Sequence, residues 1–334
     1  MPQSGLNLPE HEVQPRFRRR RLALTVLLAL AVTADATGEV PNRTPLPDRT
    51  AAIRMVPLAL GPMAAPVGVQ LRGAWAVTSP DPRFMGLSAL AVRGGRLLAL
   101  TDSGVTIDFP KPGGAAVTRL RDLPAGPGYP TFKKYRDGEA LLRSADGGWF
   151  VTFEFQHSLW RFDSAFGKGA RLVDLAPMDW PRNAGVEAVV GAPGGGLLLF
   201  PESGRGVLQL RDGQGRLLPL AGRTGGVADA VTLPDGRIVV AVREVGLGLV
   251  NRLAWLEPDG GGYRLRPFAT LPLGWIDNVE GLAAETLPDG ATRLWAVTDN
   301  DGWRRTVLVE LLLPPARERH GLRLRPAPSW RAHA

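Results

Sequence analysis

A motif repeats five times along this chain, at intervals of about fifty residues. Each copy opens on a polar, mostly acidic residue followed by a short apolar run. A second apolar run then ends on another polar residue. The openers are 51, 48, 42 and 51 residues apart, and they are Ser88, Glu139, Glu187, Asp229 and Glu280. A period in this range is typical of a β-propeller or of another repeat array, so the repeat constrains the fold more than any other feature.

Composition favours β-structure for these repeats. The 334 residues include 41 glycines and 30 prolines, and apolar runs of five to eight residues bounded by Gly, Pro or Asp recur throughout. No stretch has the periodicity of a long amphipathic helix. A chain of this length can form one repeat domain or two ordinary domains. These features predict an all-β protein.

Each repeat can be divided into strands. In the second copy, strands are expected over residues 139–143, 149–154, 157–163 and 170–175, with a turn that begins at Asp146. Asp-Gly pairs favour hairpin turns because they tolerate positive φ. Four antiparallel strands make one propeller blade. We therefore predict a β-propeller of five four-stranded blades.

The propeller is expected to span residues 67–313, and its closure depends on the last repeat. That repeat contains three clear strands, so the fourth is expected from residues 67–77, ahead of the first blade. Such an N-terminal strand would close the ring and protect the sheet edge at the joint. A sixth blade, built partly from residues 51–80, is the alternative.

The two ends of the chain differ from the repeats. A basic segment, an apolar run over residues 22–32 and a small-x-small site predict a signal peptide over residues 1–36. The apolar run is about half the ~20 residues that a membrane span needs. We therefore expect a periplasmic or secreted protein with no stable membrane span after cleavage, exported by the Sec or the twin-arginine route. Residues 37–66 are interpreted as a linker and residues 314–334 as a basic tail.

Charge and cysteine content limit the partners. The net charge is +8, but +6 of it lies in residues 1–36 and 316–334. Because the repeats carry no basic stripe interleaved with aromatic residues, nucleic-acid binding is not expected. The chain has no cysteine, which excludes disulfides and thiolate metal sites. We expect a monomer held together by its core, by ring closure or by a bound metal ion.

Hairpin geometry places the polar ends of each repeat together. In an antiparallel pair, the start of one strand lies beside the end of the next, and the first strand of a blade lines the central channel. Carboxylates should therefore gather at one mouth of the channel, where they repel one another unless a cation neutralises them. Hard divalent cations such as Ca²⁺ prefer such oxygen ligands. The candidate metal ligands are Glu139, Glu154, Glu187, Glu202, Asp229, Glu280 and Asp299.

For any one of these residues, a structural role is the alternative. A carboxylate at a strand end can accept hydrogen bonds from backbone N–H groups of the neighbouring blade instead of binding a metal ion. The first repeat also departs from the acidic pattern, because its opener is Ser88.

Several short segments resemble the signature of one family. They are Gly86–Leu90, Asp137–Leu141, Ala184–Val189, Asp277–Leu282 and Val297–Asp301. In order and spacing they resemble the phytase-like family, known as "esterase-like activity of phytase", over residues 71–313. The resemblance implies an exported bacterial propeller with acidic residues around its axis. It also implies a link to calcium-dependent hydrolysis of phosphate esters.

On this basis we expect a metal-dependent hydrolase of phosphate esters that uses a metal-activated water and no covalent nucleophile. Cationic side chains would hold the phosphate, and the candidates are Lys133, Arg136, Arg182, Arg243 and Arg304. Two alternatives stay open. One is a non-catalytic propeller that binds a ligand or partner and uses a structural metal ion; the other is a lactonase or another esterase of similar architecture. The orientation of the cationic side chains relative to the mouth discriminates among them.

Overall fold

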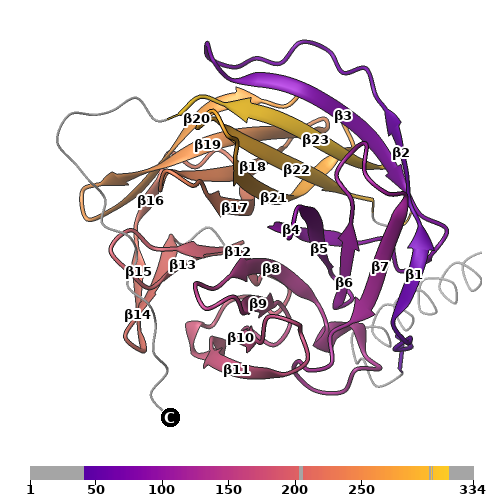
Figure 1. The fold of residues 1–334 in the computed structure, drawn as a ribbon. Coiled ribbons are helices and arrows are strands. Elements are labelled where there is room, and N and C mark those ends of the chain that lie inside the picture. The colour runs from indigo at the N-terminus through magenta and orange to yellow at the C-terminus, as the bar shows by residue number, and fades with distance from the viewer. Residues whose placement is uncertain (1–40, 203–205, 301, 303, 316–334) are drawn as a thin grey trace, which may run out of the picture. The chain divides into compact units, whose positions relative to one another are not determined.

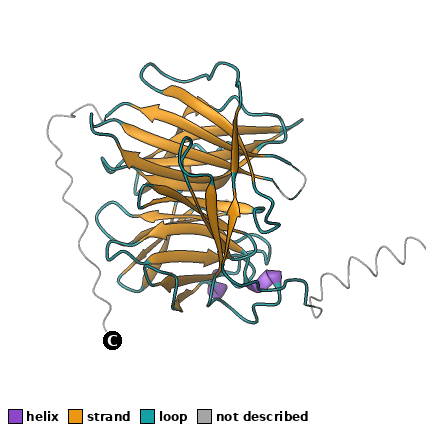
Figure 2. Cartoon of the chain, turned by 45° about the vertical axis from the view of Figure 1, so that its right-hand side comes forward, coloured by secondary structure: helices purple, strands orange, loops and turns teal. Residues whose placement is uncertain are grey.

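The described part of the chain is built from β-strands. The computed structural model describes residues 41–202, 206–300, 302 and 304–315, and the described residues from 42 onward belong to one compact unit. Among these residues the helical segments are two short 3₁₀ turns, η1 (Lys133–Tyr135) and η2 (Ala176–Met178), drawn in purple in Figure 2. None of the described helices is long and apolar enough to span a membrane. The predicted signal peptide and nearly all of the predicted basic tail lie outside the described residues.

Five sheets, antiparallel except at one edge of the fourth, surround a common axis as the blades of a propeller (Figure 1). The innermost strands are β4 (Leu87–Arg93), β8 (Gly138–Arg143), β12 (Val186–Gly191), β17 (Gly226–Thr232) and β21 (Asn278–Thr286). Each innermost strand contacts those of the two neighbouring blades, and β21 meets β4. The prediction of an all-β propeller with five four-stranded blades is therefore confirmed, and the six-bladed alternative is wrong.

Strands follow one another outward from the axis in the first four blades. Blade one continues with β5 (Arg96–Thr101), β6 (Val105–Phe109) and β7 (Val117–Asp122). Blade two continues with β9 (Trp149–Phe153), β10 (Ser158–Phe162) and β11 (Gly169–Asp174). Blade three continues with β13 (Leu197–Pro201), β14 (Val207–Arg211) and β15 (Gln214–Leu218). Blade four continues with β18 (Ile238–Val245), β19 (Leu249–Asp259) and β20 (Gly262–Thr270), and the short β16 (Leu220–Ala221) pairs with β20 in parallel.

The fifth blade combines strands from both ends of the described chain. Strands β22 (Thr292–Asp299) and β23 (Thr306–Leu313) follow β21, and β23 pairs antiparallel with β3 (Gln70–Thr78). The fourth strand of this blade thus comes from the region ahead of blade one. The segment interpreted as a linker contributes two further strands. Strand β2 (Arg54–Pro57) pairs with β3, and β1 (Arg49–Ala52) pairs with β7 of blade one.

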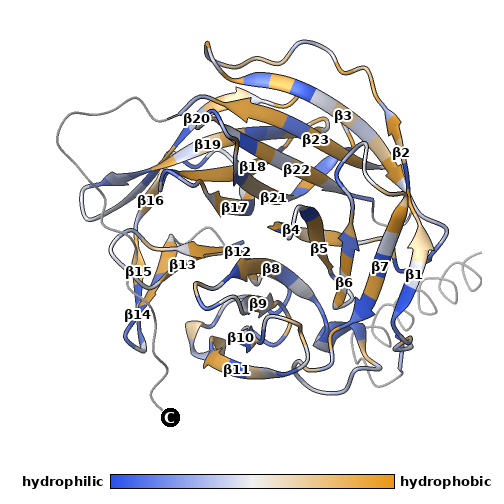
Figure 3. Cartoon of the chain, viewed as in Figure 1, coloured by the Kyte–Doolittle hydropathy of each residue, from blue (hydrophilic) through white to orange (hydrophobic). Residues whose placement is uncertain are grey.

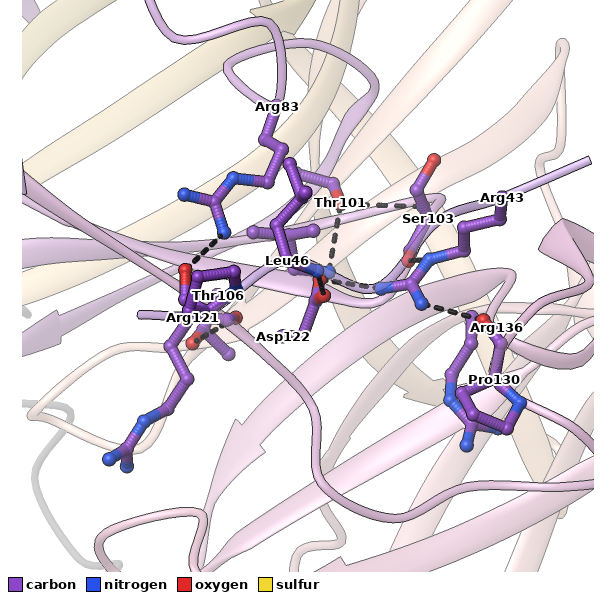
Figure 4. Close-up of polar contacts among 12 residues, drawn as sticks. Arg43, Leu46, Arg83, Thr101, Ser103, Thr106, Arg121, Asp122, Pro130 and Arg136 are labelled. Atoms are coloured by element: carbon purple, nitrogen blue, oxygen red, sulfur yellow. Dashed lines mark hydrogen bonds and ion pairs between the residues drawn. The ribbon is translucent and has the colours of Figure 1, made fainter. Parts of the chain in front are cut away.

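The residues just before β1 are also tied to blade one. The side chain of Arg43 is buried, and its guanidinium donates hydrogen bonds to Ser103 O at 2.7 Å, Pro130 O at 2.7 Å and Asp122 Oδ1 at 2.5 Å (Figure 4). The second carboxylate oxygen of Asp122 accepts a hydrogen bond from Leu46 N at 2.6 Å. This segment therefore holds blade one and the loop that follows it.

Apolar side chains of neighbouring blades pack against each other. Figure 3 shows apolar residues along the strands of each sheet. Leu98 of blade one packs in one cluster with Trp149 of blade two, and Leu90 of blade one packs with Trp295 of blade five. Both tryptophans are almost fully buried. Burial of large aromatic side chains at the joints between blades contributes strongly to stability, as expected for a propeller.

Candidate metal centre at the axial mouth

In four of the five repeats, a β-bulge turns the opening residue out of the regular ladder. In blade three, Val186 pairs with Pro201 and Ala188 pairs with Phe200, so that Glu187 between them has no partner residue across the ladder. A bulge re-aims the side chain of the extra residue. Corresponding shifts leave out Ser88 in β4, Glu280 in β21 and the pair Glu139–Ala140 in β8. The side chains of the bulged polar residues line one cavity at the axis.

In blade four the bulge lies one residue earlier, just before the opener. The shift in β17 falls between Val227 and Asp229, so Ala228 takes the bulge and Asp229 pairs with Ala241. The buried carboxylate of Asp229 accepts hydrogen bonds from Ala230 N at 2.7 Å and from Leu282 N of blade five at 2.6 Å. Asp229 is not among the residues that line the cavity. The structure thus gives Asp229 the structural role that the sequence offered as the alternative.

The cavity at the mouth has a volume of about 290 Å³. Its described lining contains seven carboxylates and one cationic side chain. The carboxylates are Asp102, Glu139, Glu154, Glu187, Glu202, Glu280 and Asp299, and the cation is Arg243. Six of the seven expected metal ligands therefore meet here. The remaining polar lining is Ser88, Asn183 and Asn278.

Four polar residues at the mouth were not selected as candidates from the sequence: Asp102, Asp137, Asn183 and Asn278. Asn278 lies two residues before the opener Glu280. Asp102 ends the first repeat, so the repeat pattern itself could have placed it at the mouth. Asp137 lies two residues before an opener, and its carboxylate is within 4.8 Å of those of Glu139 and Glu154. Asn183 precedes β12 in a loop, and no signal in the sequence singled it out.

The carboxylates form two overlapping groups of three that share Glu154. The first group is Asp137, Glu139 and Glu154, and the second is Glu154, Glu187 and Glu202. Within each group the ligand oxygens lie within 4.8 Å of one another. Carboxylate oxygens gathered in this way suit a hard divalent cation.

Burial and mutual repulsion make these carboxylates hard to ionise without a cation. Burial, followed by the charges of Glu187 and Asp137, raises the pKa of Glu139 well above its ordinary value. Burial and the charge of Glu280 do the same to the pKa of Glu187. Burial and the neighbouring Asp137 raise the pKa of Glu154 to about 8. A bound cation would stabilise the ionised forms and reverse these shifts.

Two of the five expected cationic side chains reach the mouth carboxylates. Lys133 Nζ lies 3.0 Å from Asp102 Oδ2 and 3.1 Å from Asp137 Oδ1. Burial alone would lower the pKa of Lys133, but the charges of these two carboxylates outweigh it and the pKa is raised.

Arg243 approaches the mouth from blade four. Its Nη1 bonds to Glu280 and lies 3.1 Å from Asn278 Oδ1, and its Nη2 lies 3.8 Å from Glu202 Oε1. Burial would lower the pKa of Arg243, but the charges of Glu280, Glu187 and Glu202 raise it.

The other three expected cations do not line the cavity. Arg136 is buried and donates from Nη1 to Pro127 O at 2.6 Å and to Tyr135 O at 2.9 Å, and burial lowers its pKa to about 10. Arg182 is exposed, with its guanidinium 5.9 Å from the centre of the Phe155 ring. Arg304 follows β22, where its backbone N–H donates to Asn300 O. These three residues do not assemble the expected phosphate clamp.

Fold and site together define a five-bladed β-propeller with a carboxylate-rich axial mouth. The chain belongs to the phytase-like family, described as "Esterase-like activity of phytase", whose sequence model matches residues 82–302. No curated protein matches the chain.

Solved structures with related folds share little sequence with this chain. A candidate gluconolactonase is 12% identical, with 80% of this chain and 94% of that chain covered and a TM-score of 0.44. The PQQ-bound aldose sugar dehydrogenase of Streptomyces coelicolor is 14% identical, with 80% and 100% covered and a TM-score of 0.43. A streptogramin B lyase is 8% identical, with 78% and 98% covered and a TM-score of 0.40. Likeness at this level carries no information about activity.

Proposed function

We propose that this protein is a divalent-cation-dependent ester hydrolase whose cation, Ca²⁺, binds at the axial mouth. The observation that carries the proposal is the lining of the cavity, where seven carboxylates meet and one cationic side chain opposes them. Ionised carboxylates at this density need compensation by cations. The donors are oxygen atoms, which favours Ca²⁺ over softer metals. Membership of the phytase-like family agrees with an ester as the substrate.

Glu139, Glu154 and Glu187 are the residues best suited to hold the ion. They come from neighbouring blades two and three. Glu154 belongs to both groups of carboxylates whose ligand oxygens lie within 4.8 Å of one another, and Glu139 and Glu187 each belong to one of these groups. A bound Ca²⁺ supplies a Lewis acid and lowers the pKa of a coordinated water. Arg243 of blade four and Asn278 of blade five line the same cavity and would orient an oxygen of the ester by hydrogen bonds.

The charge of the cavity favours an uncharged ester. When ionised, the seven lining carboxylates outnumber the positive charges of Arg243, the neighbouring Lys133 and one divalent ion, and a field of one sign repels ligands of the same sign. Arg136, Arg182 and Arg304 would have to face the cavity to hold a phosphate, and they are not part of its lining. A carboxylic ester or lactone therefore fits this site better than a phosphorylated substrate.

The experiment is an esterase assay on the full chain with and without a calcium chelator. We expect turnover of p-nitrophenyl acetate or of a simple lactone to exceed turnover of p-nitrophenyl phosphate, and to disappear when Ca²⁺ is chelated. Glu187→Gln should reduce turnover by about 100-fold or more, as loss of an ion-holding group requires. Glu257→Gln is the matched control, because that glutamate lies on β19 and pairs with Arg266 at 3.1 Å.

Two results would contradict the proposal. If Ca²⁺ raises the melting temperature but no ester is cleaved, the metal ion is structural and the propeller is not an esterase. If p-nitrophenyl phosphate is the better substrate, the charge argument about the cavity is wrong.

A further inference from the structure

The carboxylates around the mouth differ in whether a cationic side chain reaches them. Lys133 Nζ bridges Asp102 and Asp137 at 3.0 and 3.1 Å. In the described part of the chain, no Lys, Arg or His forms an ion pair with Glu139, Glu154 or Glu187. The middle of the cluster therefore lacks the compensation that one end receives from Lys133.

The opposite end is compensated by Arg243. This guanidinium bonds to Glu280 and lies 3.8 Å from Glu202. The side chain of Arg243 is largely buried, with 18% of its surface exposed. Two cations from distant parts of the sequence thus lie on either side of Glu139, Glu154 and Glu187, which form no ion pair of their own among the described residues.

The loop that carries Lys133 is held in place by the segment before blade one. Lys133 lies in η1, and its backbone N–H donates to Asn42 Oδ1 at 2.9 Å. The N–H groups of Asn42 and Arg43 both donate to Thr131 O, at 3.2 and 3.0 Å. Arg43 also anchors Pro130 of the same loop (Figure 4). The segment before blade one therefore positions the loop that carries the lysine.

We propose that Lys133 and Arg243 are tethered counter-ions that occupy the two ends of the mouth and limit it to a single divalent ion, held by Glu139, Glu154 and Glu187. This inference rests on the proposed binding of Ca²⁺ at the mouth. The ammonium group of Lys133 pairs with the carboxylate oxygens of Asp102 and Asp137, which a second ion would need as ligands. Asp137 already lies within 4.8 Å of Glu139 and Glu154 through its ligand oxygens. Removal of the lysine would thus leave a set of oxygens ready for a second ion.

The test is the number of Ca²⁺ ions bound per chain, measured by equilibrium dialysis with ⁴⁵Ca²⁺ and by calorimetry on the full chain. We expect one ion in the wild type, two in Lys133→Met and one in Lys133→Arg. Lys168→Met is the matched control, because Lys168 lies in the turn between β10 and β11, at the end of blade two opposite the mouth. It should bind one ion. Arg243→Met should also gain an ion, on Glu202 and Glu280.

A double variant separates a new site from a general change of charge. In Lys133→Met with Asp102→Asn, the second ion should bind at least 10-fold more weakly than in Lys133→Met. If Lys133→Met binds the same number of ions as the wild type, the proposal is overturned. Two or more ions in the wild type would also overturn it, while leaving the proposed function intact. No ion in the wild type would overturn both.

Thermal melting supplies a second readout. In chelator, Lys133→Met should melt below the wild type, because Asp102 and Asp137 then lack their cation. Excess Ca²⁺ should raise the melting temperature of this variant more than that of the wild type. An equal rise in both proteins would contradict the role of Lys133.

Discussion

Replacement of Asp229 by alanine should destabilise the fold without affecting the proposed metal site. The carboxylate of Asp229 accepts hydrogen bonds from Ala230 N and Leu282 N at 2.7 and 2.6 Å. Both donors belong to buried strands, and an unsatisfied buried N–H costs about 1–3 kcal/mol. Loss of two acceptors predicts a decrease of about 2–6 kcal/mol in the free energy of unfolding. Asp229→Asn keeps one acceptor oxygen and should lose about half as much.

The assay is urea unfolding followed by tryptophan fluorescence, with Ca²⁺ affinity measured in parallel. Asp229→Ala should lower the urea midpoint with an unchanged slope, and its Ca²⁺ affinity should match that of the wild type. Glu187→Gln should do the opposite: the urea midpoint of the calcium-free protein should change little, and the Ca²⁺ affinity should fall. If Asp229→Ala loses Ca²⁺ affinity and keeps its stability, the argument from the register of β17 is refuted.

Two further predictions concern stability. The pKa of Glu154 is raised from 4.5 to about 8 in the fold, so the folded state binds more protons than the unfolded state between these values; the calcium-free protein should therefore become less stable as pH rises from about 5 to about 8. Saturating Ca²⁺ should flatten this dependence in urea titrations, and a calcium-free stability that rises over this range would contradict the assignment. Arg43→Met should lower the free energy of unfolding by about 3 kcal/mol, the low end for a broken buried ion pair, because Leu46 N–H still donates to Asp122. The exposed Arg54→Met in β2 is its control, and an equal effect of both variants would contradict the anchoring role of Arg43.

The blades and the location of the site could be predicted because they depend on local signals. Asp-Gly turns punctuate the strands, and Gly147 and Gly236 adopt the positive φ values, 88° and 85°, that such turns require. The number of repeats then gives the number of blades. The pairing of antiparallel strands brings the openers and the closing carboxylates to one end, and six of the seven expected residues line the same cavity.

The register of single residues could not be predicted in the same way. Val227-Ala228-Asp229 and Val186-Glu187-Ala188 both place an acid near the start of a strand, but the bulge falls on Ala228 in one and on Glu187 in the other. A shift by one residue turns the side chain to another face. Packing against blade five, where Leu282 N–H needs an acceptor, decides between the two registers.

The partners of the cationic side chains also depend on contacts that the sequence does not reveal. Lys133 reaches Asp102 because η1 is attached to Asn42, 91 residues earlier in the chain. Arg136 lies three residues after Lys133, yet it is buried against backbone carbonyl groups. From their spacing in the sequence, Lys133 and Arg136 look like one basic cluster. In the fold, Lys133 pairs with carboxylates at the mouth, whereas Arg136 donates to backbone carbonyl groups.

The central claim is that the carboxylates of blades two and three bind Ca²⁺ at the axial mouth. Calorimetric titration of the calcium-free full chain tests it most directly, with wild type, Glu139→Gln/Glu187→Gln and Glu257→Gln compared under the same conditions. The account predicts saturable binding by the wild type and the Glu257→Gln control, and loss of that binding in the double variant. Binding that survives in the double variant, or a wild type that binds no Ca²⁺, would contradict it.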